Sequence, residues 1–176
     1  VHTMGPLAGG RGPVYAADIE LAMPLIEPGR KAPAFALEDQ SGTPRRLADY
    51  AGRPVIVYFY PKDDTPGCTA ESCAFQAGLP KFTKGKAAVL GISILDTASK
   101  AKFAKKYGLS FPLLADPDHA VAEKYGVWQE KSLYGRKFMG IARTTYLIGP
   151  DGKVQRRWDK VKVDGHADEV LAALAR

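Results

Sequence analysis

The sequence has little cysteine and histidine, with two cysteines and three scattered histidines among 176 residues. A structural zinc site needs about four closely spaced nitrogen or sulfur ligands, so we expect no metal. A disulfide-stapled secreted domain would be smaller and richer in cysteine. The longest apolar run covers residues 55–60. A membrane helix needs about 20 apolar residues, so we expect no membrane partner either.

Positive charge is in modest excess, with 25 Lys and Arg against 19 Asp and Glu, which gives a formal net charge of +6. The cations gather only loosely, over 100–106 and 156–160, and they form no aromatic-interleaved basic motif and no recognition-helix pattern. Such groups are usually solvated faces, so we expect no nucleic-acid partner. With 45% hydrophobic and 25% charged residues, the chain has the composition of a globular protein.

The first part of the chain differs from the rest because glycine and proline recur through residues 1–28. We interpret 1–28 as a flexible extension and 29–176 as one domain. One hypothesis places the natural start at Met23, with residues 1–22 as an upstream addition. The segment lacks the pattern of a secretory signal, and we expect a cytoplasmic protein.

From residue 31 onward, strand and helix patterns alternate. The expected elements are a hairpin of 34–37 and 43–47, a strand at 55–60, a helix at 67–84, a strand at 88–94, a helix at 99–107, a strand at 111–114, a short helix at 119–125, a hairpin of 144–148 and 154–158, and a final helix at 166–174. This order predicts an α/β protein, a thioredoxin-like sandwich with a central mixed β-sheet flanked by helices.

The most informative segment is Pro61-Lys62-Asp63-Asp64-Thr65-Pro66-Gly67-Cys68. It follows a buried strand and ends where a helix can begin, so Cys68 falls in the first helical turn. There the unpaired backbone N–H groups and the positive end of the helix dipole favour a thiolate, which is the reactive form of the thiol. Thr65 lies three residues earlier, within reach of the sulfur.

The second cysteine, Cys73, follows Cys68 by five residues. On an intact helix this spacing separates the two Cα atoms by roughly 8–9 Å, beyond the limit of about 7 Å for a disulfide. A bond between them therefore requires the start of the helix to unwind. Two unrelated buried thiols are the alternative, because cysteine is often buried.

The segment Pro61–Cys68 resembles the P-x-x-x-T-x-x-C signature of the peroxiredoxins. The position of Cys73 resembles the peroxiredoxin Q subfamily, also called bacterioferritin comigratory protein. The resemblance extends from about Pro28 to the C-terminus and includes the stretches Gly91-Ile92-Ser93 and Gly140-Ile141-Ala142-Arg143-Thr144-Thr145.

The resemblance implies a role for each of five residues. Cys68 would be the peroxidatic cysteine, oxidised to a sulfenic acid, and Cys73 would resolve it as an intramolecular disulfide. Thr65 would hydrogen-bond the peroxide and the thiolate, and Pro61 would shield the cysteine from solvent. Arg143 would lie beside the sulfur, where a permanent cation stabilises a thiolate and can donate to peroxide oxygens. A surface ion pair is the alternative for Arg143.

Three positions depart from the subfamily pattern. Leu95 stands where Asp is common, Lys100 stands where His is frequent, and Gln76 stands where the subfamily usually has Arg. These departures bear on the contacts around the site and on how readily the helix unwinds.

The implied activity is reduction of hydrogen peroxide and organic hydroperoxides, with thioredoxin as the reductant and no bound cofactor. An internal disulfide needs no partner chain, so we expect a monomer. Two rival functions stay open. One is a thiol–disulfide oxidoreductase, which the absence of Cys-x-x-Cys disfavours. The other is a redox-sensing or chaperone-like binding module, which would consume peroxide only stoichiometrically.

Overall fold

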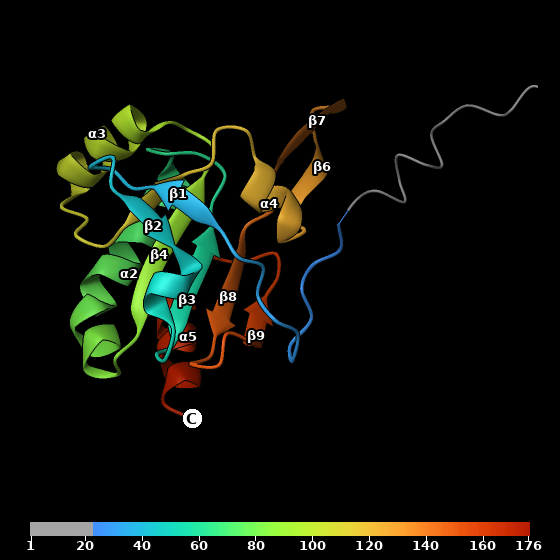
Figure 1. Cartoon of the computed structure of the whole chain (residues 1–176). Coiled ribbons are helices and arrows are strands. Elements are labelled where there is room, and N and C mark those ends of the chain that lie inside the picture. The colour runs from blue at the N-terminus through green and yellow to red at the C-terminus, as the bar shows by residue number, and fades with distance from the viewer. Residues whose placement is uncertain (1–22) are drawn as a thin grey trace, which may run out of the picture.

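A five-stranded mixed sheet runs through the centre of the computed structural model, which describes residues 23–176 (Figure 1). The strands lie in the order β5 (Leu113–Ala115), β4 (Ala88–Ser93), β3 (Val55–Phe59), β8 (Thr144–Ile148) and β9 (Val154–Trp158). Neighbours among β3, β4 and β5 pair in parallel, whereas β8 is antiparallel to both β3 and β9. The predicted mixed sheet is confirmed.

The central strand β3 is buried along its whole length, as its apolar and β-branched sequence predicts. Successive side chains point to opposite faces of a sheet, so β3 contributes to two cores. Val57 and Phe59 belong to one core, and Ile56 and Tyr58 belong to the other. Because both cores hold β3 in place, the point at which the chain leaves β3 for the cysteine segment is also fixed.

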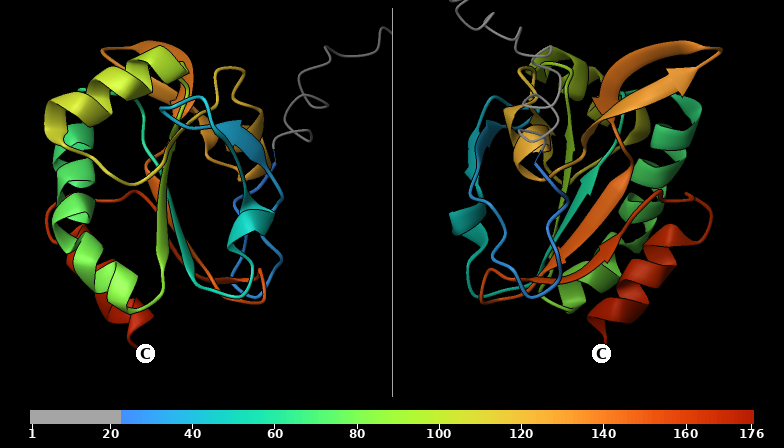
Figure 2. Two further views of the ribbon diagram at one scale, coloured as in Figure 1. Left: turned by 60° about the vertical axis from the view of Figure 1, so that its left-hand side comes forward. Right: turned by 90° about the vertical axis from the view of Figure 1, so that its right-hand side faces the viewer.

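Three helices cover one face of the sheet: α2 (Pro66–Lys84), α3 (Thr97–Tyr107) and α5 (His166–Leu174). Figure 2 shows the sheet between these helices and the elements on the other face. Phe75 of α2 stacks on Tyr58 of β3 with ring centroids 4.6 Å apart. In the described part of the chain, no helix combines the length and apolarity needed to cross a lipid bilayer.

Smaller elements cover the opposite face. They are the hairpin of β1 (Ala36–Glu38) and β2 (Pro44–Arg46), the 3-10 helix η1 (Leu47–Tyr50) and the helix α4 (Ala120–Lys124). The sequence did not predict η1. The strand expected over 43–47 ends at Arg46, because η1 begins at the next residue. The Asp49 carboxylate accepts the backbone N–H of Arg46 at 2.9 Å, which starts the helical turn.

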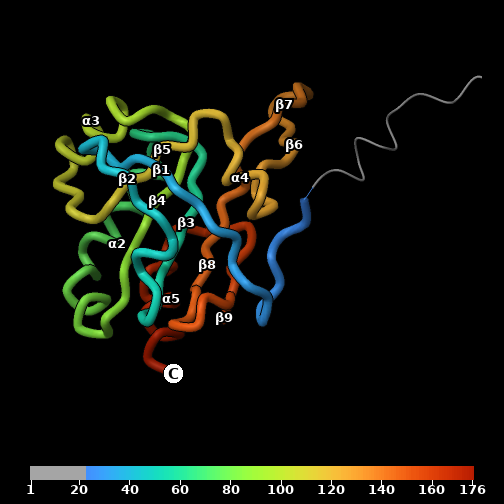
Figure 3. The backbone as a smooth tube through the Cα atoms, viewed as in Figure 1, coloured from blue at the N-terminus to red at the C-terminus, as the bar shows by residue number. Residues whose placement is uncertain are grey.

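Residues 24–27 correct the predicted domain boundary, which assigned them to the flexible extension 1–28. Leu25 and Ile26 pack against the core, and the Ile26 N–H donates to the Tyr146 hydroxyl at 3.2 Å. Figure 3 shows this blue segment passing beside β9 and α4. At Gly126, a Cβ atom would lie 2.4 Å from the backbone of Pro24. Residues 1–22 lie outside the described residues, and the hypothesis of a start at Met23 is not tested.

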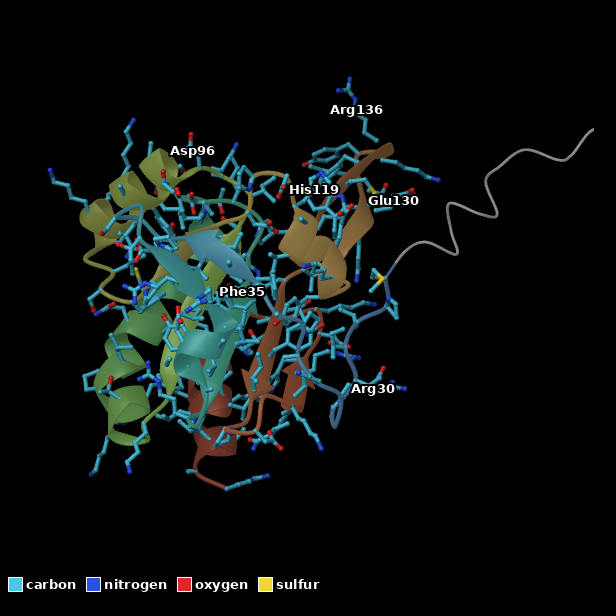
Figure 4. All side chains as sticks on the ribbon, viewed as in Figure 1. Arg30, Phe35, Asp96, His119, Glu130 and Arg136 are labelled. Atoms are coloured by element: carbon cyan, nitrogen blue, oxygen red, sulfur yellow. The ribbon has the colours of Figure 1, made fainter. Side chains whose placement is uncertain are left out.

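The sequence analysis also missed a third hairpin, formed by β6 (Trp128–Leu133) and β7 (Arg136–Ile141). Its turn residues Tyr134 and Gly135 both have positive φ, as a two-residue hairpin turn of type I′ requires. The hairpin projects from the body of the molecule, and Arg136 lies at its outer end (Figure 4). The chain then leaves β7 and reaches Arg143 just before β8.

Candidate active site

Cys68 is the third residue of α2 and is buried, with 1% of its surface exposed. Thr65 occupies the N-cap position in an extended conformation, and Pro66 is the first helical residue, where proline fits without loss of a hydrogen bond. The first turn contains no acidic residue. Cys68 therefore belongs to the first helical turn, where backbone N–H groups are unpaired and the helix dipole has its positive end.

The Arg143 guanidinium joins two side chains of α2. Its Nη2 donates to Cys68 Sγ at 3.1 Å, and its Nη1 donates to the Glu71 carboxylate at 2.7 Å. Among the five residues predicted for the site, Arg143 and Cys68 are thus in direct contact. The planar guanidinium holds both partners in a fixed geometry and keeps its positive charge at any physiological pH.

Gly67 gives the guanidinium room against the start of α2. A Cβ atom at this position would lie 3.3 Å from Arg143 Nη2, closer than most real Cβ contacts. Any larger residue would press on the group that contacts the sulfur. The glycine before Cys68 therefore helps to set the Arg143–Cys68 distance.

Glu71 belongs to the site but was missed by the sequence analysis. It is the only acidic residue of α2 and is 1% exposed. Burial raises the pKa of its carboxyl to about 7, against the opposing effect of the Arg143 charge. The only signal in the sequence was its spacing, because a residue three positions after Cys68 shares a helix face with it.

The raised pKa of Glu71 predicts a pH-dependent stability. The folded-state pKa of about 7 lies above the ordinary 4.5, so folding disfavours the ionised form. The stabilisation is fully present below the ordinary pKa and is lost as the pH rises through about 7. Between about pH 4 and about pH 8, urea unfolding of the wild type should lose up to about 3 kcal/mol relative to Glu71→Gln.

The matched control for this measurement is Glu38→Gln, because Glu38 is exposed on β1. Its unfolding free energy should follow the wild-type curve across the pH range. Parallel curves for the wild type and Glu71→Gln would contradict a titrating carboxyl at position 71.

Thr65 and Pro61 both lie on the loop between β3 and α2. The Thr65 hydroxyl donates to the carbonyl oxygen of Lys62 at 3.0 Å, rather than to the Cys68 sulfur. Pro61 is half-buried and follows the fully buried Tyr60. The catalytic roles expected of both residues stay predictions.

Cys73 is half-buried, and both cysteines are free thiols. It lies five residues after Cys68 within the continuous helix α2. The preceding residue, Ser72, is fully buried and hydrogen-bonds the Tyr58 hydroxyl at 2.8 Å. In the reduced state, α2 thus holds the two cysteines apart and is itself held against β3.

The profile of the AhpC/TSA family matches residues 28–157. The chain belongs to the AhpC/TSA family. Its relatives include Peroxiredoxin Bcp of Xanthomonas campestris, 48% identical over 133 residues that cover 76% of this chain and 83% of that one. Peroxiredoxin Bcp of Bacillus subtilis is 42% identical over 149 residues, which cover 85% of this chain and 95% of its own.

Solved structures of this AhpC/TSA branch have the same fold. A structure of the Xanthomonas campestris bacterioferritin comigratory protein, studied for its alkyl peroxide reduction activity, matches with a TM-score of 0.77 at 45% identity. It covers 80% of this chain and 90% of that one. Mycobacterium tuberculosis AhpC, 24% identical, shares the fold with a TM-score of 0.72 and covers 86% and 93%. The resemblance to the peroxiredoxin Q subfamily and the thioredoxin-like fold class are confirmed.

The structure shows the surroundings of the three residues that depart from the subfamily pattern. Asp96, next to the half-buried Leu95, caps α3 by accepting the Ser99 N–H at 2.9 Å (Figure 4). Gln76 exchanges hydrogen bonds with Ser110, accepting its N–H at 2.8 Å and donating to its hydroxyl at 2.9 Å. This pair holds the middle of α2 against the segment before β5. Lys100 is fully buried.

Proposed function

We propose that this chain is a thiol peroxidase that reduces hydrogen peroxide and organic hydroperoxides with Cys68. The observation that carries the proposal is the 3.1 Å contact between the Arg143 guanidinium and the buried Cys68 sulfur at a helix N-terminus. The thiolate is the nucleophilic form of a cysteine, and reactive cysteines are typically found beside a cation or at a helix N-terminus. Pro61 and Thr65 complete the pocket, and the Thr65 hydroxyl turns from Lys62 to the bound peroxide.

In the first step, the Cys68 thiolate attacks the terminal peroxide oxygen. An S–O bond forms as the O–O bond breaks, so sulfur is oxidised to a sulfenic acid and the peroxide is reduced. The departing hydroxide or alkoxide takes a proton and leaves as water or an alcohol. Arg143 stabilises the negative charge that develops on these oxygens as the bond lengthens.

In the second step, the Cys73 sulfur attacks the Cys68 sulfenic acid. The new S–S bond displaces hydroxide, which leaves as water with the proton from Cys73. Because α2 holds the two Cα atoms roughly 8–9 Å apart, its first turns must unwind before the bond can form. A dithiol protein, which we propose to be thioredoxin, then returns two electrons by exchange and is itself oxidised. Every step of the cycle takes place within one chain, so we propose that the protein is a monomer. We also propose that it is cytoplasmic.

The test is a stopped-flow assay of hydroperoxide consumption with thioredoxin and thioredoxin reductase. Continued turnover that depends on both peroxide and thioredoxin supports the proposal. Dithiol exchange without dependence on peroxide would instead identify a thiol–disulfide oxidoreductase. Loss of one equivalent of peroxide and no more would identify a redox-sensing module.

The Cys73→Ser variant should consume one equivalent of hydroperoxide and then stall in the thioredoxin-coupled assay. The serine hydroxyl cannot form a disulfide with Cys68, so thioredoxin has no disulfide to reduce. Burst amplitude and steady-state rate separate the two steps. Cycling at the wild-type rate would show that Cys73 does not resolve the sulfenic acid.

The Ser72→Ala variant should form the Cys68–Cys73 disulfide faster than the wild type. It removes the hydrogen bond to Tyr58 that holds this part of α2 in place. A bond of this kind contributes about 0.5–1.5 kcal/mol, so the rate should rise roughly 2- to 10-fold. Tyr58→Phe removes the same bond from the sheet side and should act in the same direction. Equal or slower disulfide formation in both variants would contradict unwinding as the limiting motion.

A further inference from the structure

A fully buried lysine lies against the loop that carries Pro61 and Thr65. Lys100 of α3 is 0% exposed, and its Nζ donates to both carboxylate oxygens of Asp63, at 2.9 and 3.1 Å. It also donates to the Ser93 hydroxyl at 2.6 Å. An ammonium group has three hydrogens, and three acceptor atoms surround this one.

Asp63 is enclosed as well, with 6% of its surface exposed. Besides the ammonium group, its carboxylate accepts the Tyr60 hydroxyl at 2.6 Å and the Ser99 hydroxyl at 2.7 Å. Tyr60 directly follows β3, Ser99 belongs to α3, and Ser93 is the last residue of β4. One carboxylate thus ties the loop to the sheet and to a helix whose sequence begins more than 30 residues later.

A buried pair of this kind is weak evidence for stability, because desolvation of two charges offsets their attraction. A fully hydrogen-bonded polar network does, however, specify one arrangement of the groups that form it. Here the arrangement is that of the loop between Pro61 and Thr65. Asp63 lies midway between these two residues and five positions before Cys68.

The next residue of the loop, Asp64, is also attached to α3, at the surface of the protein. Asp64 has a positive φ of 55° and accepts Lys106 Nζ at 2.8 Å and the Tyr107 hydroxyl. Both partners lie in the last turn of α3. Further along α2, Gln76 is held by Ser110. The stretch between these two attachments contains both cysteines.

We propose that Asp63 and Lys100 form a buried anchor that keeps the loop Pro61–Thr65 in place while α2 unwinds. Lys100 is then a positioning residue, which acts on Cys68 through the loop. This inference rests on the proposed function, since it assigns a fixed boundary to the unwinding in that cycle. The peroxide pocket keeps its shape while Cys68 leaves it, and it receives Cys68 again after reduction.

Chemical labelling of lysines tests the anchor in the wild-type protein. The reduced form and the disulfide form, made with diamide so that peroxidase activity is not required, are treated with an acetylating reagent and mapped by mass spectrometry. We expect Lys100 to resist acetylation in both forms. Lys106, which has a 61% exposed side chain on the same helix, should react in both and is the internal control.

Acetylation of Lys100 in the disulfide form would show that the loop leaves with the helix and would overturn the proposal. Acetylation in the reduced form would overturn the burial on which it stands. Failure of diamide to join Cys68 and Cys73 would count against the resolving step of the proposed function. In that case the kinetic comparison below still tests the anchor.

The Lys100→Met variant tests positioning by separating the two steps of the cycle. Displacement of the loop should slow Cys68 oxidation by roughly 10- to 100-fold, because small misplacements near a reacting group are costly. Disulfide formation should not slow, since α2 is freed rather than held. Lys106→Met removes the cation of an exposed pair, which contributes little to holding the loop, so it should change the oxidation rate far less than Lys100→Met does. Oxidation of folded Lys100→Met within twofold of wild type would overturn the proposal, and the labelling result decides if this variant does not fold.

Discussion

The Cys68→Ser variant should consume no hydroperoxide beyond the uncatalysed rate, whatever reductant is supplied. A serine hydroxyl is not appreciably ionised near neutral pH and is a far weaker nucleophile than a thiolate. Apart from Cys73, the remaining groups of the site have no atom that can accept the peroxide oxygen, and the contact of Arg143 with sulfur is made to Cys68. Peroxide loss followed by a dye assay, with and without thioredoxin, measures the effect.

The variant should fold, because serine is close in size to cysteine and its oxygen can accept the hydrogen bond that Arg143 now donates to the sulfur. Circular dichroism checks this. Cys73→Ser is the matched control, since it changes a half-buried cysteine of the same helix and should still reduce one equivalent. Peroxide turnover in folded Cys68→Ser would place the reacting atom elsewhere.

The Arg143→Met variant should oxidise Cys68 roughly 100- to 1000-fold more slowly, the usual cost of removing a donor aimed at developing charge. Two effects add in this variant. The sulfur loses the cation 3.1 Å away, and the peroxide oxygens lose a donor as their bond lengthens. Arg143→Lys should recover only part of the rate, because an ammonium group cannot contact sulfur and carboxylate in the same fixed plane. Single-turnover stopped-flow kinetics measure the rate.

The single change also leaves the Glu71 carboxyl buried without its partner, which can destabilise the protein for reasons unrelated to catalysis. The double variant Glu71→Gln/Arg143→Met removes that carboxyl as well. It should be as slow as Arg143→Met but more stable in urea. Recovery of the oxidation rate in the double variant would mean that Arg143 serves only to neutralise Glu71.

The parts of the fold that the sequence predicted are those with a strong local pattern. The run over β3 is apolar and β-branched without interruption, and it forms the central strand. The Pro66-Gly67 pair marks the start of α2, and the predicted helix end at Lys84 agrees with the structure. These features depend on short-range physics, so a window of about ten residues suffices to recognise them.

The hairpin of β6 and β7 was missed because neither strand carries a clear buried face. Most of its residues are half-buried or exposed, so apolar and polar positions do not alternate in the sequence. Its turn begins with Tyr134, which is not a residue that usually marks such turns. The packing of Leu25 and Ile26 was missed for another reason, since their partners lie far along the chain.

In the site as well, residues with a local sequence pattern were predicted, and residues that depend on distant partners were missed. The positions of Cys68 and Cys73 on one helix follow from their spacing and from the loop before them. Glu71 and Lys100 look like ordinary surface charges in the sequence, because charged side chains are usually solvated. Each is buried only because the fold supplies an opposite charge, from Arg143 in one case and Asp63 in the other. Such pairs join residues too far apart in the chain for local patterns to reveal.

The most direct test of the account is a peptide map of the wild-type protein after one equivalent of hydroperoxide, with no reductant present. The account predicts that Cys68 and Cys73 are recovered in one disulfide-linked peptide and that the peroxide has been converted to water or an alcohol. If the peroxide is consumed while Cys68 is recovered as an unmodified thiol, the proposed chemistry is wrong.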